Sequence, residues 1–400
     1  MTRRDGRWMT AGEASRSLGV NRATLYAYVS RGFIRSEARP GRSRERRYAR
    51  EDVERLQRRN EERRDPAKAA GRALQWGLPI LESGITLIAG GKFYYRGHDA
   101  VRLSATHSVE QVASLIWTGG FDADFSDTPL HVISGGTAAG LPFTSRAQSV
   151  LAVVSARDPL AWDLRPHAVA QSGWRILNLM TSVAAESAEL SDTIEETLAR
   201  AWLTKSHHAA ELIRAALILC ADHELNVSSF TARCVASAGA NPYSVVIGGL
   251  AAIEGTKHGG AAIRVENLLA ALRRSRDVRR ALAERLRRGE PIDGFGHRLY
   301  PTGDPRATAI MSMLRERFPK SPELVYAQSV ATAGESLTGE KTTIDFALAA
   351  LSRVLRLPSG SPLMLFALGR AIGWIGHAIE QYGLDAIIRP RARYVGQTPE

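Results

Sequence analysis

Beyond about Ala67, apolar residues recur with the spacing of α-helices, and this pattern limits the fold more than any other feature of the chain. Val112 and Leu115, for example, fall on one face of such a helix. One short hairpin is expected as an exception, with strands over residues 85–88 and 92–95 on either side of two glycines. The sequence therefore predicts an all-α fold class for the body of the protein.

Length and hydropathy narrow the class of protein. The chain has 400 residues, 44% of them hydrophobic, so we expect two or more globular units. Its most apolar stretch, residues 361–383, carries Arg370, His377 and Glu380, so no uninterrupted apolar run reaches the roughly eighteen residues that a membrane helix needs. The N-terminal residues lack the apolar segment and cleavage site of a secretion signal. A cytoplasmic location without membrane contact is therefore expected.

Basic residues are concentrated near the N-terminus. The formal net charge is +12, and residues 1–65 hold 18 Lys and Arg against 10 Asp and Glu, a net of +8. Such an asymmetry indicates an appendage that binds a polyanion, joined to a nearly neutral body.

Two short helices are predicted inside this basic segment. Thr10 and Glu13 have the spacing of a capping box, so the first helix begins there and ends near Gly19. Asn21 is a good N-cap for a second helix over residues 22–31. Two helices joined by a tight turn form a helix-turn-helix. The sequence LGVNRATLYAYVSRGFI resembles the opening of MerR-like winged DNA-binding domains, and RPGRSRERRYAREDVERL resembles their wing and next helix.

Small residues dominate the outer face of the second helix, which permits close approach to a DNA groove but offers few donors for reading bases. Arginines of the wing suit phosphates, which add affinity without sequence preference. The candidate nucleic-acid contacts are Arg22, Thr24, Tyr26, Arg42 and Arg44. The alternatives are a solvated arginine-rich loop, or a dimerisation or docking module with the same fold. We expect this domain to occupy residues 1–65 and to end at Asp65-Pro66.

Candidate functional residues of the body include two histidines that are weak signals alone. His223 lies between two apolar helical patterns, where a histidine is usually structural. His258 precedes two glycines, which free the backbone for close approach of a ligand.

The segment GFGHRLYPTGDPR, residues 294–306, is far rarer by chance. His297 follows two glycines, and Asp304-Pro305 predicts a turn that aims Arg306 toward this histidine. A fourth segment contains Asp345 and is followed by several arginines.

Metal binding would be one use for these histidines and the aspartate. The histidines lack HxH, HExxH and HxxxH spacing, and Cys220 and Cys234 lack CxxC spacing, so we expect two buried thiols and no metal. The surplus of arginines favours a small di- or tricarboxylate substrate, because guanidinium groups bind carboxylates bidentately. Glycine motifs for dinucleotides or nucleoside triphosphates are absent from the sequence.

Six segments in order resemble the citrate synthase family: YYRGHD, ADHELN, KHGGA, GFGH with DPRA, IDF, and GRAIGW with RP and RYVG. The similarity spans about residues 75–396, and the N-terminal extension resembles a bacterial subgroup in which a helix-turn-helix precedes the enzyme. This resemblance implies an acyl-CoA condensing acyltransferase that joins acetyl-CoA, oxaloacetate and water into citrate and CoA. It implies no cofactor beyond the coenzyme A thioester.

The resemblance implies three catalytic roles. Asp345 matches the general base that removes a proton from the thioester methyl group. His258 matches the donor to the thioester oxygen, which stabilises the developing enolate. His297 matches the group that polarises the ketone of oxaloacetate and supplies a proton to the new alkoxide.

The residues that match the family's oxaloacetate-binding groups are His223, Arg306, Arg370 and Arg389. In family homodimers the counterpart of Arg389 reaches across to the other subunit, and a packing role is its alternative. The implied fold is a large helical domain over 67–264 and 361–400, with an inserted small helical domain over 265–360 that closes on the substrate.

Three positions depart from the family pattern. Pro301 stands where many members have a basic residue that meets the coenzyme phosphates, so the CoA-binding residues stay open. Thr342-Thr343 replaces a frequent Pro-Asn, and His98 replaces a tyrosine.

Two other functions stay open. One is a 2-methylcitrate synthase that uses propionyl-CoA, since one methylene changes discrimination by only about 1–3 kcal/mol. The other is a DNA-binding regulator whose synthase-like body senses a metabolite.

Overall fold

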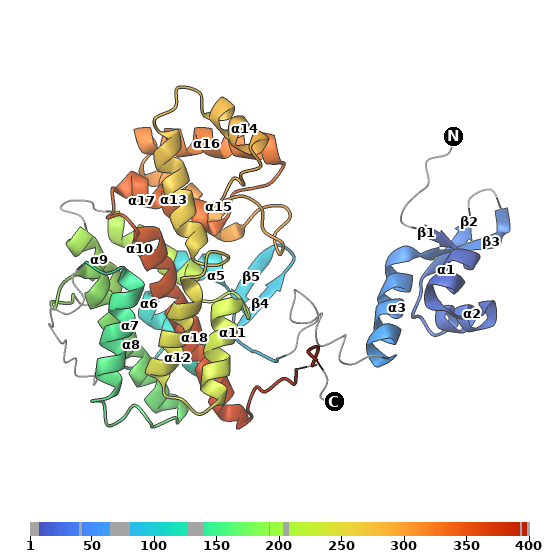
Figure 1. The fold of residues 1–400 in the computed structure, drawn as a ribbon, viewed down its shortest axis with the longest axis horizontal. Coiled ribbons are helices and arrows are strands. Elements are labelled where there is room, and N and C mark those ends of the chain that lie inside the picture. The colour runs from blue at the N-terminus through green and yellow to red at the C-terminus, as the bar shows by residue number, and fades with distance from the viewer. Residues whose placement is uncertain are drawn as a thin grey trace. The chain divides into compact units, whose positions relative to one another are not determined.

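A computed structural model describes residues 8–39, 42–64, 81–125, 140–191, 193–202, 208–392 and 394–397. The chain divides into two compact units, residues 1–82 and 83–400, each with its own hydrophobic core. The described residues form seventeen helices and two small three-stranded sheets, which confirms the predicted all-α class (Figure 1).

In the described part of the first unit, three helices pack with one antiparallel sheet. Its elements are β1 (Trp8–Thr10), α1 (Ala11–Leu18), α2 (Arg22–Ser30), β2 (Ser36–Arg39), β3 (Arg42–Ala49) and α3 (Arg50–Arg64), and the strand order is β1-β3-β2. The predicted capping box is confirmed, because the Thr10 hydroxyl accepts from the Glu13 amide while the Glu13 carboxylate accepts from the Thr10 amide. Gly19 ends α1 with a φ of 63°, a left-handed conformation that glycine adopts without strain.

The core of this unit fixes the angle between α1 and α2. Leu25 of α2 is fully buried and packs against Ala14 and Leu18 of α1, with Ile34 and Val53 completing the cluster. The helix-turn-helix predicted from the sequence is therefore present. Asp65-Pro66, the predicted end of the domain, lies outside the described residues.

The second unit opens with the predicted hairpin, in which β4 (Thr86–Ala89) pairs antiparallel with β5 (Lys92–Tyr95) and a short β6 (His98–Asp99) pairs with β5. The helices that follow are α5 (Ala100–Thr106), α6 (Val109–Thr118), α7 (Phe143–Ser155), α8 (Pro166–Ala185), α9 (Ile194–Trp202), α10 (Ala209–Cys220), α11 (Val227–Ser237), α12 (Pro242–Ile253), α13 (Gly260–Leu272), α14 (Val278–Arg287), α15 (Pro305–Arg317), α16 (Pro322–Thr338), α17 (Ile344–Leu355) and α18 (Ser361–Leu384).

Helix α18 runs through the middle of the second unit (Figure 1) and contacts α8, α10, α11 and α12. By length and composition it is apolar enough to cross a membrane, yet 83% of its most apolar window is buried inside the unit. It is the central core helix of this unit. Helices α13 to α17 form a group of mutual contacts within residues 260–355, and the small-domain bounds 265–360 stay a prediction.

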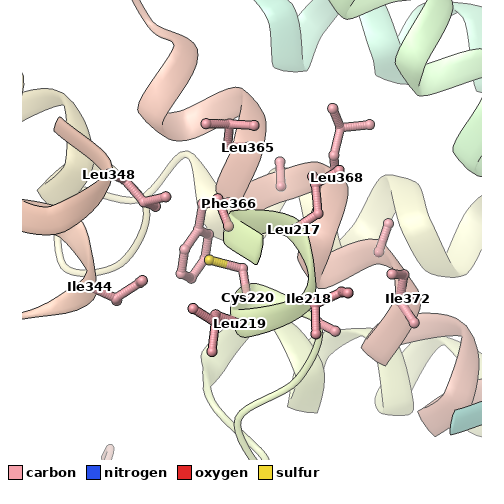
Figure 2. Packing of buried hydrophobic residues seen from close by; sticks show 14 of the residues in the cluster. Leu217, Ile218, Leu219, Cys220, Ile344, Leu348, Leu365, Phe366, Leu368 and Ile372 are labelled. Atoms are coloured by element: carbon pink, nitrogen blue, oxygen red, sulfur yellow. The ribbon is translucent and has the colours of Figure 1, made fainter. Parts of the chain in front are cut away.

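The ends of α10, α17 and α18 meet over one apolar cluster. Figure 2 shows Leu217 and Cys220 of α10, Ile344 and Leu348 of α17 and Phe366 of α18 in this cluster. Because the C-terminal end of α10 and the N-terminal parts of α17 and α18 converge here, polar residues next to these positions are brought to one place.

The prediction of two buried thiols is correct for one cysteine only. Cys220 is buried, but Cys234 of α11 is half-buried, and both are free. Cys234 lies on a face of α11 that the neighbouring residues cover only in part, so the apolar helical pattern overestimated its burial.

Candidate active site

His223 lies in the loop after α10, and its side chain is almost completely buried. Its Nε2 atom is 2.9 Å from the Tyr300 hydroxyl, and its ring centroid is 5.2 Å from that of His297. Burial, followed by the positive charges of Arg306 and Arg370, holds the pKa of His223 well below its ordinary value. The imidazole is therefore neutral at pH 7.

His297 follows a loop that pairs with the segment before Asp345. The Gly296 amide donates to the Lys341 carbonyl at 2.8 Å, and the Thr343 amide donates to the Gly294 carbonyl at 2.9 Å. Gly294 and Gly296 have φ values of 90° and 81°, so other side chains would be strained there. This loop brings two distant segments of the site together.

The protonation of His297 follows from its surroundings. Burial and the charge of Arg306 lower the pKa of His297, so its ring is neutral at pH 7. The Leu299 amide donates to Nδ1 at 3.2 Å, which places the single ring proton on Nε2. His297 is therefore a neutral hydrogen-bond donor through Nε2.

Asp304 connects Arg306 to the helix that carries Asp345. Its carboxylate accepts from Arg306 Nε at 2.9 Å and Nη2 at 2.8 Å, and both side chains are almost completely buried. The same carboxylate accepts from the Ile344 amide at 3.0 Å, at the first turn of α17. The predicted Asp304-Pro305 turn is thus the start of α15, with Asp304 as its N-cap.

Asp345 lies in the first turn of α17 and is half-buried. Burial raises the pKa of its carboxyl to about 6, while Arg306 lowers it and Asp304 raises it further. A carboxylate with this pKa is a better base than an ordinary aspartate and is still ionised at pH 7.

His258 begins a tight turn into α13. Its Nε2 atom is 2.8 Å from the Ser228 hydroxyl, which leaves Nδ1 for a ligand. Burial lowers the pKa of His258 to about 4, with a smaller contribution from Arg370, so the ring is neutral. The next residue must be glycine, because a Cβ at Gly259 would lie 2.4 Å from the Ile253 carbonyl oxygen.

Arg370 of α18 is completely buried. Its Nε donates to the Cys220 carbonyl at 2.8 Å, whereas Nη1 and Nη2 have no hydrogen-bond partner. Its guanidinium lies 5.1 Å from the ring of Phe366, which in turn lies 5.8 Å from the ring of His258. Because a buried guanidinium with two free donor groups is costly, this side chain is suited to an anionic ligand.

The structure brings together His223, His258, His297, Asp345, Arg306 and Arg370 through these contacts. Arg389, after α18, is exposed, and the described contacts of a single chain do not join it to this group. A cavity of about 560 Å³ opens between α15 and α16, with Asp304 and Thr342 in its wall. In the described residues, no three His, Cys, Asp or Glu side chains lie close enough together to hold a metal ion.

Sequence reasoning missed two residues of the site. Tyr300 is almost completely buried, bonds to His223, and lies 5.8 Å below the Arg306 guanidinium. Its position between His297 and Arg306 could have indicated it. Ser228, the partner of His258, follows an N-cap in an ordinary helical pattern and gave no such signal.

The candidate DNA-binding surface is only partly described. Arg22 and Tyr26 of α2 are exposed, and the Thr24 hydroxyl donates to Asn21. The side chains of Arg42 and Arg44 lie outside the described part of the chain. In the wing, Arg46 donates to the neutral hydroxyl and carbonyl of Ser36 and keeps its positive charge, whereas Arg47 pairs with Glu37 and covers Trp8.

Comparison with known proteins agrees with this geometry. The family model described as "Citrate synthase, C-terminal domain" matches residues 145–391, and a "Helix-turn-helix domain" model matches residues 8–61. The citrate synthase of Haloferax volcanii is 30% identical over 359 residues, which cover 80% of this chain and 94% of that protein. The chain belongs to the citrate synthase family.

Other relatives match over a shorter range. A Mycobacterium tuberculosis family member is 36% identical over 196 residues, and the 2-methylcitrate synthase of Shewanella oneidensis is 36% identical over 189 residues. The matches cover 47% and 46% of this chain, and 52% and 50% of those relatives. The chain thus spans about half the length of these curated relatives.

Solved citrate synthase structures share the fold. The enzyme of Thermotoga maritima is 26% identical and covers 81% of this chain and 95% of its own, with a TM-score of 0.67. A ternary complex of the Thermoplasma acidophilum enzyme with carboxymethyl coenzyme A and oxaloacetate has a TM-score of 0.69, with coverages of 81% and 95%. At 23% identity, the second likeness supports the fold alone.

Proposed function

We propose that this family member is a citrate synthase, which condenses acetyl-CoA with oxaloacetate and hydrolyses the thioester to citrate and CoA. The observation that carries the proposal is the combination of a buried arginine with two free donor groups and a carboxyl whose pKa is raised to about 6. The first suits an anionic acceptor substrate and the second suits removal of a proton from carbon. The reaction needs no cofactor beyond the coenzyme A thioester.

Oxaloacetate binds, in this proposal, among Arg370, Arg306 and His223. The free Nη groups of Arg370 take one carboxylate, and Arg306, held by Asp304, contributes to the other. The Nε2 proton of His297 lies on the side of the ring that is not bonded to the backbone, and it donates to the ketone oxygen. As the new carbon–carbon bond forms, this proton passes to the alkoxide.

Asp345 takes a proton from the methyl group of the thioester, and His258 stabilises the resulting enolate. Because Nε2 of His258 is engaged with Ser228, the donor to the thioester oxygen is Nδ1. This requires the Ser228 hydroxyl, which also lies 2.9 Å from Asn226 Oδ1, to direct its one proton to Nε2 of His258. Water then hydrolyses the citryl thioester and releases CoA.

The domain arrangement of the family supports a closing motion. We infer that residues 265–360 form the small domain, which carries His297, Arg306 and Asp345, and that the remaining body carries His223 and Arg370. Closure brings the base to the acetyl group and excludes water from the enolate. Arg389 completes the site of the other subunit in a homodimer.

The acyl donor decides between two functions. Purified protein should release CoA thiol from acetyl-CoA only when oxaloacetate is added, and absence of release would overturn the proposal. Propionyl-CoA should be tested beside it, because the 2-methylcitrate synthase relative is as similar as the mycobacterial one. A kcat/KM higher for propionyl-CoA than for acetyl-CoA would assign 2-methylcitrate synthesis instead.

The pH dependence of the wild-type enzyme provides a test of the base. Because burial raises the pKa of Asp345 to about 6 in the free protein, kcat/KM is expected to fall about tenfold per pH unit below that value. With an ordinary aspartate, kcat/KM would be independent of pH down to about pH 4. Circular dichroism over the same range checks that the protein stays folded. A kcat/KM that is constant between pH 7 and pH 5 would contradict the assignment.

We further propose that the helix-turn-helix unit binds DNA. Arg22 is exposed on α2, on the helix whose Leu25 faces the core, and the segment as a whole carries a net charge of +8. The full chain is expected to retard DNA in a gel, less so as salt increases. Arg22→Ala should reduce the slope of log affinity against log salt by about 1, whereas Arg157→Ala in the second unit should not change it. No retardation at low salt would dismiss DNA binding.

A further inference from the structure

A second cluster of buried charges lies behind the oxaloacetate-binding residues, and the chemistry proposed above does not use it. Asp222 and His377 are both completely buried. Asp222 Oδ1 lies 3.2 Å from His377 Nε2, and Asp222 Oδ2 accepts from the Thr86 hydroxyl at 2.6 Å. A buried ion pair of this kind adds little net stability as a rule, so its presence calls for another explanation.

Asp222 is adjacent in sequence to His223. Hydrogen bonds to α18 and to Tyr95 hold the backbone of residues 221–222 in place. The Gly373 amide donates to the Ala221 carbonyl at 2.9 Å, and the Asp222 amide donates to the Tyr95 hydroxyl at 3.2 Å. A Cβ at Gly373 would lie 2.4 Å from the Ala221 carbonyl oxygen and 2.6 Å from Asp222 Oδ1. The loop that carries His223 is therefore in direct contact with α18.

The same helix holds this loop at two points. Arg370 and His377 are seven residues apart on α18, so they lie on one face of the helix. Arg370 donates to the Cys220 carbonyl and His377 contacts the Asp222 carboxylate, which places the loop between two cationic side chains. The Asp222 carboxylate interacts with both positive charges, so a loss of charge at His377 changes the electrostatic surroundings of Arg370 and of the loop that carries His223.

We propose that His377 is a positioning residue of the oxaloacetate site: as an imidazolium it fixes the Asp222 carboxylate, and through it the orientations of His223 and Arg370. His377 itself does not contact substrate. The inference rests on the proposed function, since it concerns the affinity for oxaloacetate.

The charge state of His377 agrees with this role. Burial lowers its pKa, but the charges of Asp222 and Glu380 outweigh burial and raise the pKa to about 9. Nδ1 lies 3.7 Å from Glu380 Oε2. The groups that face this pair from the neighbouring elements are Thr86 of β4, Tyr95 of β5, Arg233 of α11, and Arg370 and Glu380 of α18. Arg233 pairs with Glu380 at 3.3 Å and Arg370 is near Asp222, so each cation has an acidic partner.

The positive charge of His377 predicts how the KM for oxaloacetate depends on pH. A histidine whose pKa is raised on folding stabilises the folded site fully below its ordinary pKa of about 6.5, and this stabilisation is lost as pH rises through about 9. The KM for oxaloacetate of the wild type should thus be constant from pH 7 to about 8.5 and rise above about pH 9, while the KM for acetyl-CoA changes much less.

The experiment compares His377→Gln with the wild type and with His167→Gln, a control at an exposed histidine. Glutamine can still donate to Asp222 but carries no charge. In His377→Gln, the KM for oxaloacetate should rise about tenfold at pH 7.5, kcat should stay within about threefold, and the alkaline rise in KM should disappear. The control should match the wild type.

Several results would overturn the proposal. An unchanged KM for oxaloacetate in a folded His377→Gln would do so, as would an equal loss in kcat and in both KM values. If His377→Gln does not fold, the pH dependence of the KM for oxaloacetate in Asp222→Asn and in the wild type tests the proposal instead. Without its carboxylate partner His377 loses its proton more readily, so the alkaline rise should move to lower pH in Asp222→Asn, and a wild type with no alkaline rise would reject the idea. A wild type that does not use oxaloacetate at all would instead reject the proposed function.

Discussion

Replacing Asp345 with asparagine is expected to lower kcat about 10³-fold while the KM for oxaloacetate changes little. The amide has nearly the shape of the carboxylate but cannot take a proton from carbon. In the proposed function oxaloacetate is held by Arg370, Arg306 and His223, whose own hydrogen bonds to Cys220, Asp304 and Tyr300 do not involve Asp345. Steady-state release of CoA thiol, with each substrate varied in turn, measures both quantities.

Stability separates a chemical role of Asp345 from a structural one. Because the pKa of this carboxyl is raised from 3.8 to about 6 in the folded protein, its ionisation disfavours the folded state as pH rises through this range. The melting temperature of Asp345→Asn at pH 8 should therefore equal or exceed that of the wild type. Asp385→Asn, at an exposed position after α18, is the matched control and should change neither activity nor melting temperature. Retention of more than a tenth of the wild-type kcat in Asp345→Asn would remove this residue from the mechanism.

Replacing Arg370 with methionine is expected to separate binding from stability. The affinity for oxaloacetate should fall at least about 100-fold, because a charge-paired arginine of a buried site is worth roughly 2–5 kcal/mol when removed. The free protein, in contrast, should be as stable as the wild type or more so. Its guanidinium is completely buried with two donor nitrogens that have no partner, and an apolar side chain of similar length relieves that cost. Isothermal calorimetry and chemical denaturation give the two values.

Arg233→Met is the matched control for this prediction. Arg233 is also completely buried, but its guanidinium donates to Gln381 and pairs with Glu380. Its removal takes this donor from the buried Gln381 amide oxygen and one cation from Glu380, and should destabilise the free protein by roughly 3 kcal/mol. If Arg370→Met were destabilised as much as Arg233→Met, the Nη groups of Arg370 would not be free donors that await a substrate carboxylate.

The sequence by itself predicted features that depend on a few neighbouring residues. The capping box of Thr10 and Glu13, the end of the first helix near Gly19, and the hairpin around Gly90-Gly91 were all expected, because backbone sterics and helix-end hydrogen bonds are local. Helical spacing of apolar residues likewise gave the all-α class.

The candidate site was predicted in part for a different reason. The glycines before His297 and Asp304 before Arg306 are short-range patterns with specific backbone requirements, and the order of such segments matched a known family. The pairing of residues 294–296 with 341–343 could not be read from them, because it joins segments that are distant in sequence. Tyr300, Ser228 and the pair of Asp222 with His377 were missed, since their importance lies in a contact with another helix.

Only the tertiary structure decided the protonation states and the costs of burial. Asp345 and Asp222 are both aspartates in apolar surroundings, yet burial raises the pKa of the first to about 6, whereas the charge of His377 keeps that of the second below its ordinary value. The two buried arginines differ in a similar way, because Arg233 pairs with Glu380 whereas Nη1 and Nη2 of Arg370 have no hydrogen-bond partner. The physical reason is that propensities and caps act over one or two turns of chain, while desolvation and charge pairing depend on whichever segments folding places within a few ångströms.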